Sequence, residues 1–279
     1  MRGPVLMILA LALFAALDTA GKLLAQAGYG FPQSVMMRYA LVLPVAIPLA
    51  VVQGARLGEG RIRFHVLRGA AMLVSSSGFF LAFTTLPLAE GYLVYFTAPF
   101  MTIAASRLVL GEDVPRAAWI WAGVGFAGVL IAVADGVGSG GAPYGYLAAF
   151  MGSVAYAAVA TINRILRTSR STAAILFWPA LIATLALLPA AVVTWKPLDA
   201  NALLLMLANG AFWSVATLCI VTAFRHAPAA RLAPLEYTAL LWALGIDWLV
   251  FAHPPSAHVI AGGAVVILAC VMSERAQKR

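Results

Sequence analysis

The sequence predicts an all-α integral membrane protein with ten transmembrane helices, arranged as two inverted five-helix repeats. Three observations support this fold class. Hydrophobic residues make up 63% of the chain and charged residues only 10%, and the mean hydropathy of +0.95 lies far above that of soluble domains. Apolar segments recur along the whole chain, and one segment of the first half is repeated in the second half.

Ten apolar segments are long enough to cross a bilayer. A helix needs roughly 17 to 25 mainly apolar residues to span the hydrocarbon core. The expected spans lie near residues 4–24, 32–52, 66–86, 91–110, 116–135, 144–164, 173–193, 201–224, 229–251 and 257–273. The loops between them are too short to hold a further domain, so the chain is expected to lie within the lipid bilayer along its whole length.

The repeat is visible in one ungapped pair of segments. Residues 83–98 align with residues 224–239, 141 positions later, and five of the sixteen positions are identical. The Gly-rich turn at residues 135–143 separates the two halves, because a helix does not pass easily through such a turn. We therefore predict a first repeat over residues 1–138 and a second over residues 139–279. Many secondary transporters build alternating access around a central site from such inverted halves.

Basic residues alternate from loop to loop, and this pattern predicts the orientation. With a cytoplasmic N-terminus, fifteen of the eighteen lysines and arginines fall on the cytoplasmic side, and Lys196 falls in an outer loop. Lys22 and Arg38 lie within predicted helices. We expect a multi-pass protein of the bacterial cytoplasmic (inner) membrane with both termini inside. The net charge of +8 then reflects membrane orientation and does not indicate a nucleic-acid partner.

Four charged side chains within the predicted spans are candidates for function, because charge inside a membrane is costly. Asp18 and Arg38 share a depth in the first two spans, so an ion pair between them is expected, either as a permanent lock or as part of a substrate site. Glu236 lies several residues into the ninth span and aligns with Tyr95, and it could bind a cationic substrate, carry a coupling proton or bond a neighbouring helix. For Asp247, near the outer end of that span, solvent contact is the expected role.

Lys22 in the first span aligns with Arg164 in the sixth. Long basic side chains near helix ends usually extend to the lipid headgroups. We therefore expect Lys22 to reach the outer surface and Arg164 the inner one.

Aromatic and polar side chains gather on the helices expected to line a central cavity. Tyr92, Tyr95 and Phe96 follow the i, i+3, i+4 spacing of one helical face. That face could stack on a planar or cationic ligand group, or it could serve helix packing. The further candidates for substrate binding in the second half are Tyr156, Asn163, Trp213, Tyr237 and Trp242.

The sequence contains no pattern that predicts catalysis, a cofactor or a metal site. The histidines fall at predicted membrane edges, and no pair of them shares a helical face. The glycines of residues 123–128 match a dinucleotide-binding pattern, but they lie within an apolar span, where close helix packing is the better interpretation. Cys219 and Cys270 are expected to pack between apolar helices.

Several motifs resemble the drug/metabolite transporter superfamily, EamA type, over essentially the whole chain. They are Leu86-Pro-Leu-Ala-Glu-Gly91, Phe96-Thr-Ala-Pro-Phe100, Leu110-Gly-Glu-Asp113, Ala227-Pro-Ala-Ala230 and Ala233-Pro-Leu-Glu-Tyr-Thr-Ala-Leu-Leu-Trp242. The resemblance implies two inverted five-helix repeats around a cavity and the movement of small organic solutes. Asp18-Thr-Ala-Gly-Lys22 and Met37-Arg-Tyr39 are similar to a branch that includes S-adenosylmethionine uptake carriers. His253 departs from the family pattern, which has Gly-Glu there.

The residues and the resemblance together lead us to expect a secondary transporter of a small polar or amphipathic metabolite, zwitterionic or cationic, such as an amino-acid derivative. Coupling to an ion or to a counter-substrate is possible within this expectation. A broad-specificity drug or metabolite exporter of the same fold is the alternative. A membrane-embedded enzyme is a distant alternative, because the sequence contains no reactive constellation.

Overall fold

The computed structural model describes residues 2–52, 57, 62–111, 113–138, 143–165, 172–226 and 233–277, and within these ranges every regular element is helical. The elements of the first half are α1 (Arg2–Gln26), α2 (Phe31–Ala40), α3 (Leu43–Val52), α4 (Ile62–Phe83), α5 (Leu88–Tyr95), α6 (Ala98–Leu110) and α7 (Arg116–Gly138). Those of the second half are α8 (Pro143–Ile165), α9 (Thr172–Val193), α10 (Ala200–His226), η1 (Ala233–Tyr237), α12 (Thr238–Leu249) and α13 (Ala257–Gln277).

Seven segments within the described ranges are long and apolar enough to cross a membrane. They are Arg2–Gln26, Phe31–Val52, Ile62–Phe83, Leu88–Val109, Pro143–Asn163, Ala173–Val193 and Ala200–Ala223. Two shorter apolar helices lie at Arg116–Ala132 and Ala257–Ser273. The expected span at 229–251 begins outside the described residues, so the count of ten stays a prediction. An all-helical, multi-pass membrane protein is confirmed.

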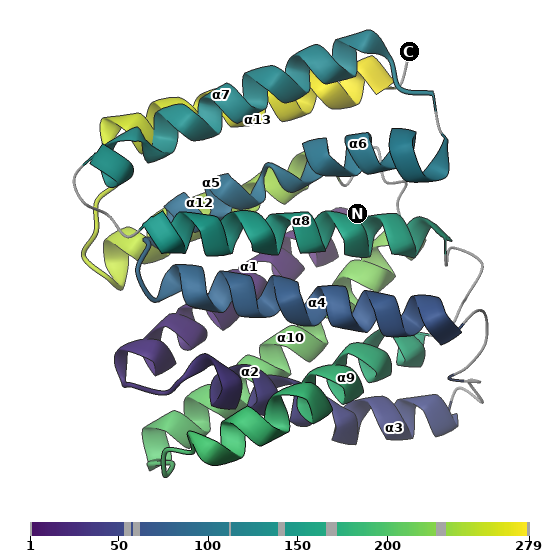
Figure 1. Cartoon of the computed structure of the whole chain (residues 1–279), viewed down its shortest axis with the longest axis vertical. Helices are drawn as coiled ribbons and strands as arrows, with labels where there is room; N and C mark the ends of the chain where they lie inside the picture. The colour runs from purple at the N-terminus through teal and green to yellow at the C-terminus, as the bar shows by residue number, and fades with distance from the viewer. Residues whose placement is uncertain are drawn as a thin grey trace.

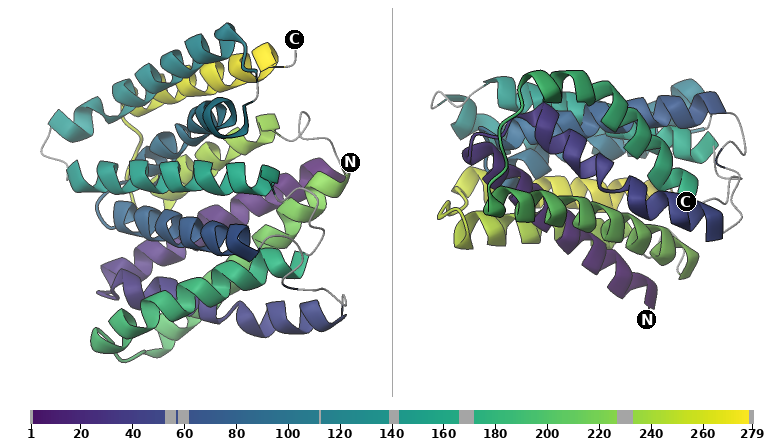
Figure 2. Two further views of the ribbon diagram at one scale, coloured as in Figure 1. Left: turned by 45° about the vertical axis from the view of Figure 1, so that its right-hand side comes forward. Right: turned by 90° about the horizontal axis from the view of Figure 1, so that it is seen from below.

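The helices form a bundle in which most helices pack closely against one main partner. In Figure 1, α7 and α13 lie side by side along one edge, while α2, α3 and α9 form the opposite edge. Between these edges α4 packs on α8, and α1 packs on α10. Both chain ends lie at the same end of the bundle, as the left view of Figure 2 shows.

Glycines set the closest helix contacts. A Cβ on Gly262 of α13 would lie 2.5 Å from the carbonyl oxygen of Gly128 in α7, and a Cβ on Gly78 of α4 would lie 2.7 Å from the carbonyl oxygen of Ala148 in α8. Both distances are too short for a real side chain. The glycines of residues 123–128 are therefore part of a continuous membrane helix, and Gly128 serves packing as expected.

Three of the expected spans are interrupted, and in two of them proline explains the break. Pro44 lacks the N–H that would bond the carbonyl of Ala40, and the chain turns between α2 and α3. Pro99 likewise cannot bond the carbonyl of Tyr95, and α5 ends there. The third break separates η1 from α12 at Thr238.

The breaks at Thr97 and Thr238 show the same kind of hydrogen bond. The Thr97 hydroxyl donates to the carbonyl of Val94 over 2.7 Å, and the Thr238 hydroxyl donates to that of Leu235 over 2.7 Å. Both bonds reach back three residues, and the two threonines occupy the same position of the repeat. The identity of these residues between the halves thus has a local structural cause.

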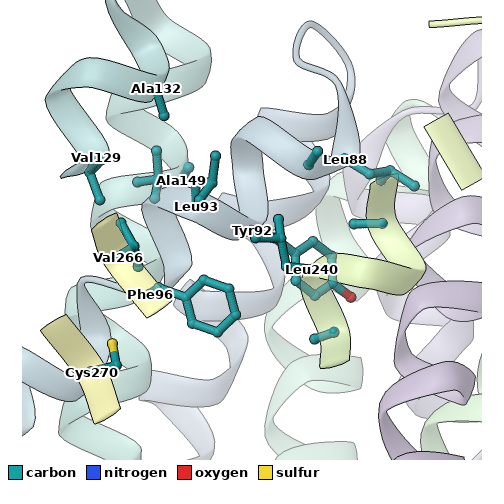
Figure 3. Close-up of a cluster of buried hydrophobic side chains, with 14 of the residues drawn as sticks. Leu88, Tyr92, Leu93, Phe96, Val129, Ala132, Ala149, Leu240, Val266 and Cys270 are labelled. Carbon is teal, nitrogen blue, oxygen red and sulfur yellow. The ribbon is translucent and has the colours of Figure 1, made fainter. Parts of the chain in front are cut away.

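The largest core cluster surrounds α5. Leu88 and Leu93 are fully buried, and Tyr92 and Phe96 are nearly so. Figure 3 shows these side chains together with Val129 and Ala132 of α7, Leu240 of α12, and Val266 and Cys270 of α13. This packing on several sides fixes the direction in which α5 presents its tyrosines.

A first prediction concerns the contact between α7 and α13. We expect Gly262→Ala to destabilise the protein by about 1–3 kcal/mol, because its methyl group would overlap the α7 backbone. Gly123→Ala is the matched control, since a Cβ at Gly123 meets nothing within 4 Å. Thermal unfolding in detergent measures the difference. Equal melting temperatures for the two variants would contradict the close contact.

Candidate functional site

The first part of the candidate site joins α1 to α5. The Tyr92 hydroxyl donates a hydrogen bond of 2.8 Å to Oδ2 of Asp18. The Tyr92 ring stacks on Phe83 of α4, with ring centroids 6.1 Å apart. Asp18 is half-buried, whereas Tyr92 is 8% exposed. The carboxylate of Asp18 is therefore held in place by a packed tyrosine.

Tyr95 is the centre of the aromatic cluster. Its ring lies 5.0 Å from Tyr156 of α8, 5.6 Å from Phe79 of α4 and 5.8 Å from Phe96, measured between ring centroids. Elements from both halves of the chain thus meet at one side chain.

Glu236 adds a second carboxylate near this cluster. It lies in η1, and its charge acts on the hydroxyls of both Tyr95 and Tyr156. Tyr95, Tyr156 and Glu236 are all half-buried. We define the tyrosine site as Asp18, Tyr92, Tyr95, Tyr156 and Glu236, contributed by α1, α5, α8 and η1.

The predicted ion pair between Asp18 and Arg38 is not formed, and this part of our expectation is wrong. Arg38 instead donates from Nε to Oδ1 of Asn209 in α10, and Asn209 donates from Nδ2 to the carbonyl of Leu17 over 2.8 Å. Ion pairs within 4.0 Å join Lys22 to Asp247 and Arg107 to Asp113. Arg38 still acts on Asp18 through its charge.

The remaining guanidinium nitrogens of Arg38 face α1. Nη2 of Arg38 lies against Gly21 of α1, where a Cβ would be 3.6 Å from it, an ordinary contact distance. Arg38 is only 5% exposed. Within the described part of the chain, neither Nη1 nor Nη2 has a hydrogen-bond partner.

The other predicted site residues lie in different surroundings. Phe96 and Tyr237 contact each other at the edge of the tyrosine site, with centroids 5.6 Å apart. Trp213 is buried and packs edge-on against Tyr39, with centroids 5.2 Å apart, in a different core cluster. Trp242 is 42% exposed and Asn163 is also exposed. The structure does not bring these last three together with the tyrosine site.

Lys22 and Asp247 correct two further expectations. Lys22 is only 7% exposed, so it does not extend out of the bundle. Asp247 is only 2% exposed, so it is buried and does not face solvent as expected. Oxygens of Asp247 accept the backbone N–H groups of Leu88 and Ala89. A sequence signal existed: α5 starts after Pro87, which cannot cap it, so its N–H groups need an acceptor from elsewhere. The side chain of Arg164 lies outside the described residues.

Comparison with known proteins identifies relatives over most of the chain. The EamA-like transporter family matches residues 1–134 and again residues 143–274. The pseudopaline exporter CntI of Pseudomonas aeruginosa is 29% identical over 243 residues, covering 85% of this chain and 83% of that protein. The S-adenosylmethionine uptake transporter of Rickettsia prowazekii is 23% identical over 236 residues, covering 84% and 80%.

A crystal structure of a protein with 20% sequence identity superimposes with a TM-score of 0.68, covering 99% of this chain and 98% of that chain. At this identity the likeness concerns the fold alone. The superposition includes all the helices that hold the tyrosine site. The chain belongs to the EamA-like transporter family, and it is a transporter of small metabolites.

Proposed function

We propose that this protein moves a zwitterionic or cationic organic metabolite of the amino-acid-derivative class across the bacterial cytoplasmic membrane by alternating access. The ligand binds between α1, α5, α8 and η1. The observation that carries the proposal is the tyrosine site, where two carboxylates lie near a cluster of tyrosines and the guanidinium of Arg38 bonds Asn209 through Nε alone.

The tyrosine site suits a cationic group. Asp18 and Glu236 supply negative charge from α1 and η1, and the faces of Tyr95 and Tyr156 supply the negative side of aromatic quadrupoles. A cation in a site shielded from water gains more from such groups than it would gain in bulk solvent. Pro99 also leaves the Tyr95 carbonyl without its helical partner, and such unwound carbonyls bind cations in other transporters.

Arg38 suits the carboxylate of the same ligand. A guanidinium binds a carboxylate through two parallel hydrogen bonds, and the two terminal nitrogens of Arg38 are the ones that lack partners in the described chain. Asn209 fixes the orientation of the guanidinium through Nε. The charge of Arg38 reaches Asp18, so one small molecule could bridge the two groups.

Pairs of equivalent contacts support the proposed inverted repeats. If the first helix of each half is equivalent, α1 corresponds to α8 and α4 corresponds to α10. The contact of α1 with α10 then corresponds to that of α8 with α4, and both pairs are extensive. The matching hydrogen bonds of Thr97 and Thr238 agree with the same alignment.

The membrane topology belongs to this proposal as well. We place ten spans in two repeats, residues 1–138 and 139–279, with both termini in the cytoplasm. The alternation of basic loops and the position of both chain ends at one end of the bundle support this topology. The end where α1 stops and α5 starts is then the outer end.

The relatives support the solute class and leave the direction open. One is named as an exporter and the other as an uptake transporter, so similarity to both favours small organic solutes without choosing import or export. A thermal-shift screen of amino-acid derivatives that includes S-adenosylmethionine tests the class. Stabilisation by many unrelated lipophilic cations would instead favour the broad-specificity exporter.

A second prediction concerns the carboxylates. We expect Glu236→Gln and Asp18→Asn each to lower proteoliposome counterflow of a stabilising compound by tenfold or more. Hydrogen bonds to charged groups contribute about 1.5–3 kcal/mol, and about 1.4 kcal/mol corresponds to a factor of ten. Asp113→Asn, which alters a fully exposed carboxylate, is the control and should transport normally. Full transport by both site variants would refute the assignment.

A third prediction concerns Arg38. The wild-type protein should prefer each stabilising compound over its carboxamide analogue by roughly tenfold or more, because the carboxamide loses the charged contact. Arg38→Gln should abolish this preference, as measured by competition in counterflow. Arg107→Gln, at an exposed ion pair, should keep it. A preference that survives in Arg38→Gln would place the carboxylate elsewhere.

A further inference from the structure

Asp247 of α12 caps the first turn of a helix from the other half of the chain. Its Oδ1 accepts the backbone N–H of Leu88 over 2.9 Å, and its Oδ2 accepts that of Ala89 over 2.7 Å. Both N–H groups belong to the start of α5, where the peptide dipoles give a partial positive charge. An acidic side chain is favoured there, and it comes from across an interface between helices.

Lys22 of α1 completes the same contact. Its Nζ donates to the carbonyl of Leu86 over 2.9 Å, lies 3.9 Å from Oδ1 of Asp247, and sits 4.6 Å from the centroid of the Phe251 ring. Lys22 and Asp247 are 7% and 2% exposed. We name these two residues, with the chain they bond at Leu86, Leu88 and Ala89, the outer lock.

Further contacts hold the start of α5 on another side. The Tyr146 hydroxyl of α8 donates to a carboxylate oxygen of Glu90 in the first turn of α5. The backbone N–H of His253 bonds the carbonyl of Asp247 over 2.8 Å, which fixes the end of α12. A cavity of about 190 Å³ lined by Glu90, Asp247 and the exposed His253 borders the outer lock.

The outer lock therefore joins three segments that carry the tyrosine site. α1 carries Asp18, α5 carries Tyr92 and Tyr95, and α12 continues from η1 and Glu236. A ligand that leaves through the outer end must pass where these segments meet, so the contacts between α5 and α12 must break in each transport cycle. Breaking these contacts separates the buried carboxylate of Asp247 from the N–H groups of α5 and from the ammonium group of Lys22, which compensate its charge.

The two ends of the bundle differ in this respect. With the repeat offset of 141, Asp247 aligns with Ser106, so the first half has no carboxylate at the corresponding place in its sequence. The first helices of the two halves align at an offset of 142, which pairs Lys22 with Arg164 and keeps the basic residue. The first half therefore does not repeat the carboxylate of the outer lock at the aligned position.

We propose that Asp247 and Lys22 are positioning residues for transport, which hold the outer end closed and set a resting state that opens toward the cytoplasm. This proposal rests on the alternating-access function proposed above. The ligand-free protein should therefore be closed at the outer end, and loss of either residue should shift it toward an outward-open state.

Spin labels at the outer end test the outer lock without any substrate. We would place them at Thr85→Cys, just before α5, and Leu249→Cys, at the end of α12, because both positions are exposed. Cys219 and Cys270, which are buried, are replaced by alanine. Pulsed electron paramagnetic resonance then measures the distance between the two labels. The labelled parent protein should show one dominant short distance.

We expect Asp247→Asn and Lys22→Met each to raise the long-distance fraction at least threefold. The double variant, which carries both Asp247→Asn and Lys22→Met, should raise the long-distance fraction in the same way. Because it buries no unpaired charge, it keeps the test valid if a single variant fails to fold. Asp199→Asn is the matched control, because Asp199 also caps a helix, α10, through the N–H of Ala202, without linking α5 to α12. It should leave the distances unchanged.

An unchanged distance distribution in the folded double variant would overturn the outer lock, and so would an equal shift in Asp199→Asn. A lower melting temperature without any change in distance would show that the contact only stabilises the fold, which also overturns the proposal. The substrate assignment is judged separately by the counterflow of Glu236→Gln and Arg38→Gln. Failure of the outer lock and failure of the proposed site thus give different results.

Discussion

The structure depends on the requirement that backbone polar groups inside a membrane find partners within the protein. Continuous helices meet it by themselves, but α5 begins and ends within its span and leaves N–H and carbonyl groups at both ends. At its start the N–H groups bond Asp247, and at its end Thr97 bonds the carbonyl of Val94. The short helix that carries Tyr92 and Tyr95 is therefore stable only where it touches the second half of the chain.

The sequence predicted the parts of this arrangement that follow from local patterns. Apolar length gave the membrane helices, and the i, i+3, i+4 spacing placed Tyr92, Tyr95 and Phe96 in one cluster. The repeat indicated that Thr97 and Thr238 were equivalent, and they make the same bond. These features depend on residues near one another in the chain, so a single sequence can reveal them.

The features that the sequence did not predict depend on rotation of helices about their axes and on distant partners. Asp18 and Arg38 share a depth, but depth does not determine direction, and Asn209 lies 171 residues beyond Arg38 in the chain. Lys22 was expected at the lipid headgroups because isolated lysines extend there. Inside the bundle, the carboxylate of Asp247 on α12 and the carbonyl of Leu86 stabilise the ammonium group of Lys22 instead. Trp213 was expected at the site for its residue type, and it packs against Tyr39 instead.

Asp247, Lys22, Arg38 and Asp18 divide into two groups by what compensates their charge. Asp247 accepts two backbone N–H groups, and Lys22 donates to a carbonyl and faces that same carboxylate, so the protein itself meets their needs. Arg38 keeps two terminal nitrogens without partners in the described chain, and Asp18 is half-buried beside a single tyrosine hydroxyl. Charge that the fold compensates fully can hold a conformation, whereas charge that it compensates in part can bind a ligand. The first group joins α1, the start of α5 and α12, and the second lies where elements of both halves meet. The alternating access that we propose needs both kinds of charge, one to hold a closed end and one to bind the ligand.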